Sequence, residues 1–326
     1  MQNFKGFIVR EEGSEIKAEL ETLSLADLSE GNVVIKVEYS SLNYKDMLAF
    51  QKNGGVIRNY PQIPGIDLAG TVLNSKDPQF KKGDQVLGAG YGLGVDHTGG
   101  LSEIARVPGK WLTKLPDTMT TRTAMTFGTA GLTAGLSIDA LLKAGMKPAD
   151  EVLVTGATGG VGSIAVAILK QMGYQNLTAL VRKQNQVEIA RKLGADATLD
   201  ANTLKNGKPM QHQIFDHVLD TVGGDVAASL LSMVKVGGAM SMCGNAGGNQ
   251  LKTSVLPFIL RGISLLGIDS ITPPAKVQDR VWQKLATDWD VSEQLVVDEI
   301  SLSDTLSVIQ KLKEGQHLGR TIVKVQ

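Results

Sequence analysis

The spacing of apolar positions changes about a third of the way along the chain. Before that point the apolar residues come in short runs. Residues 33–39 begin apolar and then alternate, as a half-buried strand does, and residues 81–87 combine a turn with a strand. Residues 61–65 (PQIPG) are a turn cluster between such runs. The pattern predicts a compact, β-rich domain over residues 1–122.

Further along the chain, strands and helices alternate. Residues 151–155 are a short apolar strand, and residues 161–172 carry an apolar stripe with the i, i+3, i+4, i+7 spacing of one helix face. The alternation continues with a strand at 177–181, a helix at 187–193, and strands at 217–220, 239–242 and 264–268. This order predicts an α/β fold with a doubly wound parallel sheet over residues 123–295. The C-terminal residues 296–326 are expected to complete the first domain.

Composition and charge narrow the function classes. The chain has 326 residues, more than a single core usually holds, so two domains are expected. Lys plus Arg and Asp plus Glu both number 33, and this balance argues against a nucleic-acid or anionic-membrane partner. The single cysteine, Cys243, excludes an internal disulfide and favours a reducing, cytoplasmic setting. The most apolar stretch, residues 255–268, is interrupted by Pro257 and Arg261, so we expect no membrane span.

The turn between the first strand and helix of the second domain carries a glycine pattern. Residues 156–162 (GATGGVG) follow G-x-G-x-x-G with Ala157 in the first glycine slot. Gly159 would let the backbone approach a diphosphate, Gly162 would let the helix pack close to the sheet, and the helix N-terminus supplies N–H groups for the phosphates. A tight turn without a ligand is the alternative, but the strand before and the helix after favour dinucleotide binding.

The residues after the next strand indicate which dinucleotide is bound. An NAD site usually has an acidic residue about 20 positions after the glycines, where this chain has Val181, Arg182 and Lys183. Two cations suit the extra phosphate of NADP, because charge-assisted hydrogen bonds contribute roughly 1.5–3 kcal/mol each. The alternative is a solvated pair at the start of a helix. We therefore expect NADPH as the cofactor.

These features together resemble the medium-chain dehydrogenase/reductase superfamily. Its zinc-dependent members carry a Cys-His pair after an early strand, a Gly-His-Glu and a later Cys. This chain has Asn43 and Tyr44 at the first place, Gly-Ile-Asp at 65–67 at the second, and no Cys near residues 125–128. The resemblance therefore implies chemistry without a metal, which favours reduction of a conjugated acceptor over oxidation of an alcohol.

The resemblance narrows to the zinc-independent YhdH/YhfP-type quinone oxidoreductases, whose characterised members are NADPH-dependent acryloyl-CoA reductases. The motifs that carry it lie at residues 43–46, 63–72, 128–134, 155–162, 257–262, 266–270 and 319–325. It implies a GroES-like β-rich domain, a Rossmann domain and an active cleft between the two. One departure is at 181–183, where relatives tend to have Ser-Gly-Arg.

The expected function is NADPH-dependent reduction of an activated C=C by hydride transfer, with acryloyl-CoA, giving propionyl-CoA, as the first candidate substrate. One alternative is an NADPH:quinone oxidoreductase, and another is a non-catalytic, NADPH-binding sensor or structural protein. A homodimer is also implied, because the strand at 264–268 comes last in the sheet and relatives pair this edge across a two-fold axis.

The resemblance also implies roles for single residues. Tyr44 is the candidate catalytic residue, because its family position faces the nicotinamide; alternatively it caps a small core. Asn43 is expected to cap a helix whose first turn contains Asp46, read as structural or orienting. The expected cofactor-binding residues are Tyr44, Thr129, Thr133, Thr158, Gly159, Gly160, Val161, Val181, Arg182, Lys183, Asn245, Ser270 and Gly315. No metal ligands are expected.

The sequence allows more than one role for some charged residues. Arg58, Arg261 and Arg320 are either anchors for a CoA phosphate or surface and salt-bridge residues. His97, His212 and His317 are expected to be solvated. The chain's remaining candidates are His217, expected to satisfy a local hydrogen bond in a strand, and the glycine-rich loop 88–94, which is either a mobile rim or a series of turns.

Overall fold

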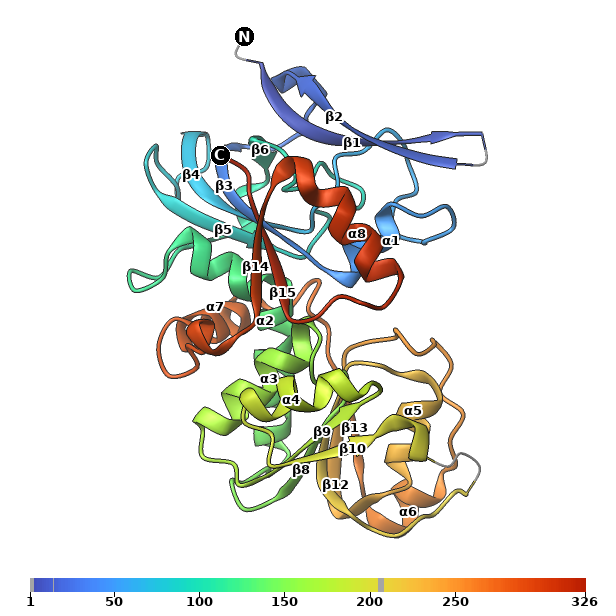
Figure 1. Ribbon diagram of the computed structural model, residues 1–326. Helices are drawn as coiled ribbons and strands as arrows, with labels where there is room; N and C mark the ends of the chain where they lie inside the picture. The colour runs from blue at the N-terminus through green and yellow to red at the C-terminus, as the bar shows by residue number, and fades with distance from the viewer. Residues whose placement is uncertain (1–2, 14, 205–207) are drawn as a thin grey trace. The chain divides into compact units, whose positions relative to one another are not determined.

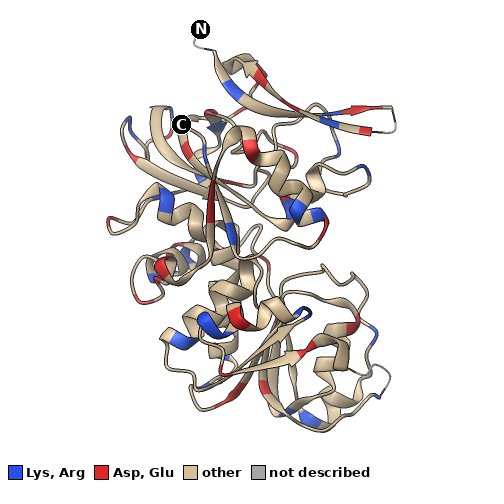
Figure 2. Ribbon diagram, viewed as in Figure 1, with Lys and Arg blue, Asp and Glu red and all other residues tan. Residues whose placement is uncertain are grey.

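The computed structural model describes residues 3–13, 15–204 and 208–326. The chain forms two compact units (Figure 1). The first comprises Met1–Thr129, Ile271–Ala286 and Val296–Gln326, and the second comprises Ala130–Ser270 and Thr287–Leu295. Basic and acidic residues are interspersed over both units (Figure 2), in keeping with the zero net charge.

The first unit is built on a largely antiparallel sheet. Among the described residues its order is β14-β15-β3-β4-β5-β7, and β6 also pairs with β3. These strands are β3 (Val33–Leu42), β4 (Asp67–Ser75), β5 (Gln85–Ala89), β6 (Ile104–Val107), β7 (Leu112–Lys114), β14 (Val297–Ser301) and β15 (Arg320–Lys324). Val33, Ile35 and Val37 are fully buried and the residues between them are partly or fully exposed, so the predicted half-buried strand is confirmed. Strand β15 pairs antiparallel with β3, which brings the end of the chain beside an early strand.

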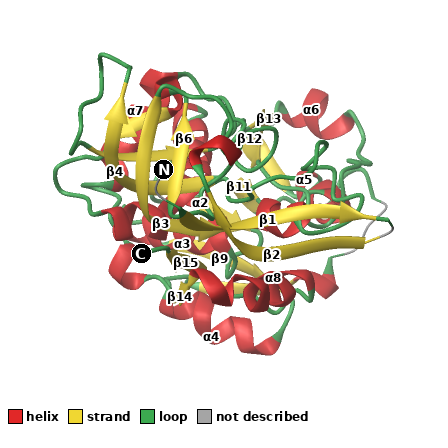
Figure 3. Ribbon diagram, turned by 90° about the horizontal axis from the view of Figure 1, so that it is seen from above, coloured by secondary structure: helices red, strands yellow, loops and turns green. Residues whose placement is uncertain are grey.

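Shorter elements surround this sheet. Strands β1 (Phe4–Glu12) and β2 (Glu15–Leu23) form an antiparallel ribbon (Figure 3). The helices of the unit include α1 (Tyr44–Ala49), α7 (Ala275–Leu285) and α8 (Thr305–Lys313). Helix α1 follows β3 directly, so it places its first residues at the end of a central strand.

The second unit contains a parallel sheet. Its order in the described residues is β10-β9-β8-β11-β12-β13, and every strand pair is parallel. The strands are β8 (Glu151–Val154), β9 (Asn176–Val181), β10 (Ala197–Asp200), β11 (Phe215–Asp220), β12 (Val234–Met242) and β13 (Ser264–Gly267). The helices are α3 (Gly160–Gln171), α4 (Gln184–Lys192), α5 (Gly224–Leu231) and α6 (Leu256–Arg261). The predicted doubly wound sheet is confirmed, with β13 at one edge.

Helix α2 (Thr121–Lys143) is the longest helix in the described residues. It is long and apolar enough by composition to cross a membrane, but 78% of its most apolar window is buried inside the protein. It is therefore a core helix of the fold. The helix is kinked at Gly128, whose φ of 52° lies outside the helical region.

Candidate active site

The glycine loop of the second unit joins β8 to α3. A Cβ atom on Gly162 would lie 2.2 Å from the carbonyl oxygen of Gly156, so only glycine allows this close approach of helix and loop. A Cβ atom on Gly159 would lie 3.3 Å from the same oxygen, which is also a tight contact. Gly159 is the N-cap of α3, whose first turn leaves N–H groups without helical acceptors. The loop therefore fits the diphosphate of a dinucleotide.

The remaining predicted cofactor residues of this unit include several that follow neighbouring strands. Val181 ends β9 and is buried, and the exposed Arg182 and Lys183 come next. The backbone N–H groups of these two residues donate to Oε1 of Gln186, at 2.8 and 3.1 Å. Asn245, which follows β12, is exposed, and Ser270, which follows β13, is half-buried. Because parallel strands end at one edge of their sheet, these residues share that edge with the glycine loop.

Thr133 and Thr158 are buried in the same unit. The carbonyl oxygen of Thr133 accepts a hydrogen bond from Oγ of Ser137 at 2.8 Å inside α2. Thr158 lies in the glycine loop, while Gly160 and Val161, at the start of α3, are half-buried.

The first unit holds a largely buried group of charged and polar residues around Asp67, which we call the Asp67 cluster: Ser41, Asn43, Asp46, Asp67 and Arg320. Asp67 begins β4 and is fully buried. Its Oδ2 accepts Oγ of Ser41 at 2.5 Å and Nδ2 of Asn43 at 2.7 Å. The backbone N–H of Thr129 donates to the same carboxylate at 3.0 Å, and the Thr129 hydroxyl donates to it as well. Thr129 is thus held against a buried carboxylate.

Arg320, the first residue of β15, provides the cation of the cluster and is 1% exposed. Its Nε donates to the Thr126 carbonyl oxygen at 2.9 Å, and its Nη2 donates to Oγ of Ser41 at 2.9 Å. Its Nη1 donates to Oδ1 of Asn43 at 3.2 Å. Burial lowers the pKa of Arg320, and the charges of Asp67 and Asp46 oppose that shift.

Asp46 is the second buried carboxylate of the cluster. Its Oδ1 accepts the N–H of Ile66 at 3.0 Å, and its Oδ2 accepts the N–H of Asn43 at 2.8 Å. Burial, together with the negative charge of Asp67, raises the pKa of Asp46 to about 7. Asn43 is the N-cap of α1, and Oδ2 of Asp46 accepts both its backbone N–H and, at 3.2 Å, its side-chain Nδ2. The expected cap is therefore confirmed as a capping box between Asn43 and Asp46, and the Asn43 amide also contacts Asp67 and Arg320.

Gly128 closes the cluster from α2. A Cβ atom here would lie 2.6 Å from both Oδ2 of Asp67 and Oγ of Ser41, and 3.0 Å from Nη2 of Arg320. The described residues contain no group of three His, Cys, Asp or Glu side chains that could hold a metal ion. The three positions compared with zinc ligands are Asn43, Asp67 and residues 125–128. They surround the guanidinium of Arg320, which would repel a second cation. These residues do not fit a zinc ion.

Tyr44 lies next to the cluster as the first residue of α1. Its side chain is 42% exposed, and Asn43 and Asp46 on either side of it are anchored in the buried cluster. Gly315 lies in an exposed turn after α8, with a φ of 63°. Of the predicted residues of this unit, the structure brings Thr129 into contact with the cluster and places Tyr44 beside it.

Two arginines and two histidines are more buried than the sequence predicts. Arg261 is 7% exposed and donates to the carbonyl oxygens of Ser232 and Val234, so neither it nor Arg320 is an anchor for a CoA phosphate. His97 is not solvated, because it is 7% exposed with its ring nitrogens 2.9 Å from two carbonyl oxygens. His317 is half-buried, and burial lowers its pKa to about 4. In each case the fold buries a side chain whose solvent exposure the neighbouring sequence does not determine.

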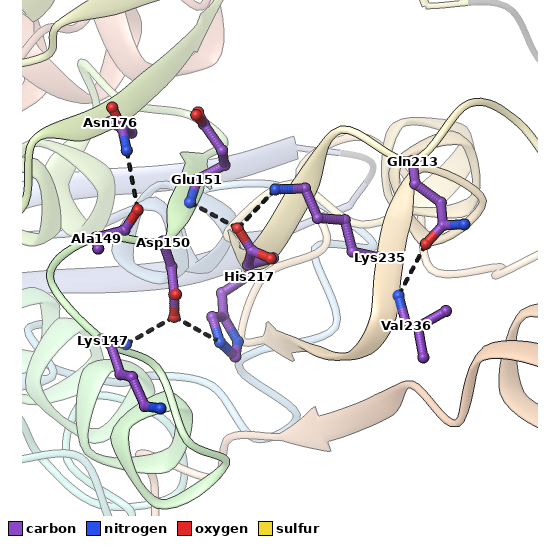
Figure 4. Close-up of polar contacts among 10 residues, drawn as sticks. Lys147, Ala149, Asp150, Glu151, Asn176, Gln213, His217, Lys235 and Val236 are labelled. Atoms are coloured by element: carbon purple, nitrogen blue, oxygen red, sulfur yellow. Dashed lines mark hydrogen bonds and ion pairs between the residues drawn. The ribbon is translucent and has the colours of Figure 1, made fainter.

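His217 lies away from the predicted cofactor edge, near the amino ends of β8 and β11 (Figure 4). Its Nε2 is 3.3 Å from Oδ2 of Asp150, which also accepts the N–H of Lys147 at 2.7 Å. The prediction of a local polar contact is confirmed. Burial lowers the pKa of His217 despite this carboxylate.

Sequence reasoning missed Arg320 as a member of the site and considered Asp67 only as a former metal position. One signal was present for each. Asp67 interrupts the largely apolar run 63–69, and Arg320 lies two residues before the apolar pair Ile322 and Val323. A charge that starts or breaks a buried strand requires a partner, but the sequence does not identify that partner.

Two family models match the chain. The alcohol dehydrogenase GroES-like domain matches residues 29–117, and the zinc-binding dehydrogenase model matches residues 160–287. Together they span more than half of the chain.

Several known proteins are similar to this chain over nearly all of its length. "Probable acrylyl-CoA reductase AcuI" of Escherichia coli (strain K12) is 43% identical over 98% of this chain and 99% of its own. The acrylyl-CoA reductase AcuI of Ruegeria pomeroyi is 40% identical over 97% of this chain and 96% of its own. YhfP of Bacillus subtilis (strain 168), which is named for quinone oxidoreductase activity, is 41% identical over 99% of both chains.

Several solved structures similar to this chain carry a bound dinucleotide, including those of E. coli YhdH and B. subtilis YhfP. E. coli K-12 YhdH with bound NADPH matches with a TM-score of 0.96 and 42% identity, over 98% of this chain and 100% of that one. B. subtilis YhfP with bound NAD matches with a TM-score of 0.95 and 40% identity, over 100% of both chains.

The raised pKa of Asp46 predicts a pH dependence of stability. The folded protein holds the Asp46 proton up to about pH 7, whereas the unfolded chain releases it near the ordinary aspartate pKa of 3.8. Stability contributed by the protonated carboxyl is therefore complete below pH 3.8 and is lost as the pH rises to 7. Relative to Asp46→Asn, we expect the free energy of unfolding of the wild type to fall by about 4 kcal/mol across this window.

Urea unfolding at several pH values measures this difference. Asp84→Asn is the matched control with the opposite sign, because Lys114 lowers the pKa of Asp84 and its stabilisation is lost as the pH falls. Parallel pH profiles for the wild type and Asp46→Asn would contradict the prediction.

Proposed function

Because the chain belongs to the medium-chain dehydrogenase/reductase family, we propose that it reduces an activated carbon–carbon double bond with NADPH, and that its substrate is acryloyl-CoA. The product is propionyl-CoA. The observation that carries the proposal is the near full-length similarity to AcuI, at 43% identity over 98% of the chain. The glycine loop supports the cofactor part, since Gly159 caps the N-terminus of α3 and Gly162 packs the helix tightly against the loop.

NADPH, when bound, supplies the hydride. Gly159, Gly160 and Val161 hold the diphosphate through the backbone at the start of α3. Arg182 and Lys183 are exposed after β9, and they pair with the 2′-phosphate. Thr133, Thr158, Asn245, Ser270 and Gly315 complete the proposed cofactor-binding set.

The substrate side of the reaction needs a hydrogen-bond donor. When hydride reaches the β-carbon of an enoyl thioester, negative charge develops on the thioester oxygen and a proton must then reach the α-carbon. We assign the donor role to the Tyr44 hydroxyl, because the side chain is exposed while its neighbours Asn43 and Asp46 are held in the Asp67 cluster. A positioned donor of this kind contributes roughly 2.7–4 kcal/mol to transition-state stabilisation.

A quinone is the second candidate acceptor. YhfP, which is 41% identical over 99% of this chain, is named for quinone oxidoreductase activity. Reduction of a quinone also places charge on an oxygen, so the same donor would serve. The acceptors therefore differ in binding rather than in the hydride step.

We also place the protein in the cytoplasm and propose that it is a homodimer. The one cysteine, Cys243, fits a reducing compartment. Strand β13 is a sheet edge, and the neighbouring α6 exposes Ile259 by 69% and Leu260 by 64%. Exposed apolar residues beside an unpaired strand are typical of an interface.

Steady-state assays with NADPH test the choice of substrate. We expect turnover of acryloyl-CoA with a kcat/KM well above that for a simple benzoquinone. Propionyl-CoA, the product, is measured directly by chromatography. Efficient quinone turnover with none of acryloyl-CoA would replace the first candidate with the second.

Tyr44→Phe tests the proposed donor. Losing one hydrogen bond made in the transition state should lower kcat about 100-fold and leave the dissociation constant of NADPH close to that of the wild type. Tyr39→Phe, which removes a tyrosine hydroxyl elsewhere in the same unit, is the matched control. An unchanged kcat in Tyr44→Phe would exclude the donor role.

Cofactor selectivity tests the two cations. The double variant Arg182→Ala, Lys183→Ala should lose about ten- to hundred-fold in preference for NADPH over NADH, through a higher KM for NADPH alone. The double variant Arg191→Ala, Lys192→Ala removes the same charge from the end of α4 and should keep the wild-type ratio. Equal ratios in the first variant and the wild type would rule out the assignment.

Sedimentation velocity tests the dimer. The wild type should sediment as a dimer at micromolar concentration, and Ile259→Asp should shift it to monomer because a charge would be buried in the interface. Leu306→Asp, at a residue that is 43% exposed on α8, should remain dimeric. A wild-type protein that is monomeric at all concentrations would defeat the proposal.

A further inference from the structure

The second unit contains a buried carboxylate that the proposed chemistry does not use. Asp220 ends β11 and is fully buried. The carboxylate accepts the N–H of Gly223 at 2.8 Å and that of Val222 at 3.3 Å. A buried carboxylate saturated by donors in this way is rigidly oriented.

The third donor to Asp220 comes from the strand that leads into the glycine loop. Thr155 follows β8, is fully buried, and donates its Oγ1 hydrogen to Oδ1 of Asp220 at 2.8 Å. Its Oγ1 also accepts the N–H of Thr221 at 2.8 Å, and its carbonyl oxygen accepts the Thr221 hydroxyl at 2.9 Å. Its backbone N–H also donates to the carbonyl oxygen of Leu219 at 3.0 Å, so four hydrogen bonds tie Thr155 to the end of β11.

These bonds fix the start of the glycine loop. Gly156 follows Thr155 with a φ of 57°, and a Cβ atom on it would lie 2.4 Å from Oγ1 of Thr221. The carbonyl oxygen of Gly156 accepts the N–H of Gly159 at 2.9 Å and is the atom against which Gly162 packs. A contiguous set of contacts thus runs from Asp220 to the first residues of α3.

We propose that Thr155 and Asp220 are positioning residues for the diphosphate of the dinucleotide. They do not contact the cofactor. They fix the backbone conformation at Gly156 and thereby orient the N–H groups of the glycine loop. The inference rests on the proposed function in one respect, that NADPH is the ligand of this loop. A loop held in its binding conformation loses little entropy when the ligand arrives.

Thr155→Val tests the proposal, because valine keeps the shape and removes the hydroxyl. We expect the dissociation constant of NADPH, measured by fluorescence titration, to rise about tenfold. Binding of adenosine 2′-monophosphate, which has no diphosphate, should stay within about twofold of the wild type. Thr155→Ser should restore NADPH binding, and Thr178→Val, the same change in the neighbouring strand β9, should not weaken it.

Thr221→Val removes the reciprocal hydroxyl bond and carries the same test if Thr155→Val fails to fold. A dissociation constant for NADPH equal to that of the wild type would overturn the inference, and so would an equal loss of adenosine 2′-monophosphate binding, because either result leaves only a general structural role. A wild-type protein that binds adenosine 2′-monophosphate but not NADPH would overturn the proposed function as well.

Discussion

The need to neutralise buried charge organises the first unit. Asp67 and Arg320 are both almost completely excluded from water, and ions in that position are stable only if donors and acceptors surround them. The residues that do so come from β3, α1, α2 and the β15 strand at the end of the chain. Because the cluster joins segments hundreds of residues apart, it fixes where α1 begins and therefore where Tyr44 is presented.

The same principle recurs in the second unit with Asp220. There a carboxylate at the end of a parallel strand collects backbone N–H groups and the Thr155 hydroxyl, and the glycine loop starts from that support. In the first unit the buried carboxylate of Asp67 stands at the start of β4 and holds Asn43 and Thr129. In the second unit that of Asp220 stands at the end of β11 and holds Thr155. In the proposed function neither carboxylate contacts a ligand. The exposed Tyr44 hydroxyl contacts the substrate, and backbone N–H groups of the glycine loop contact the cofactor.

Buried groups that position exposed binding groups are well suited to the proposed hydride transfer. A hydride transfer from a bound nicotinamide needs little covalent participation by the protein and much precision in placement. The cationic centre in the first unit is a guanidinium, which is fixed in charge and cannot bind an oxygen of the substrate while it is enclosed by Ser41, Asn43 and main-chain carbonyls. The resemblance to zinc-binding dehydrogenases therefore concerns the fold. The residues compared with zinc ligands belong to the Asp67 cluster instead.

The sequence by itself determined the strand–helix alternation, the glycine loop and the family, because each depends on residues close together in the chain. The period of apolar positions and the glycines at 156–162 are local signals, and the structure confirms the elements they predicted. Only the tertiary structure decided that Arg320 is buried, that Asp46 has a pKa of about 7 and that His97 is enclosed. Burial and charge neighbours are set by segments far apart in sequence, and no local pattern carries them.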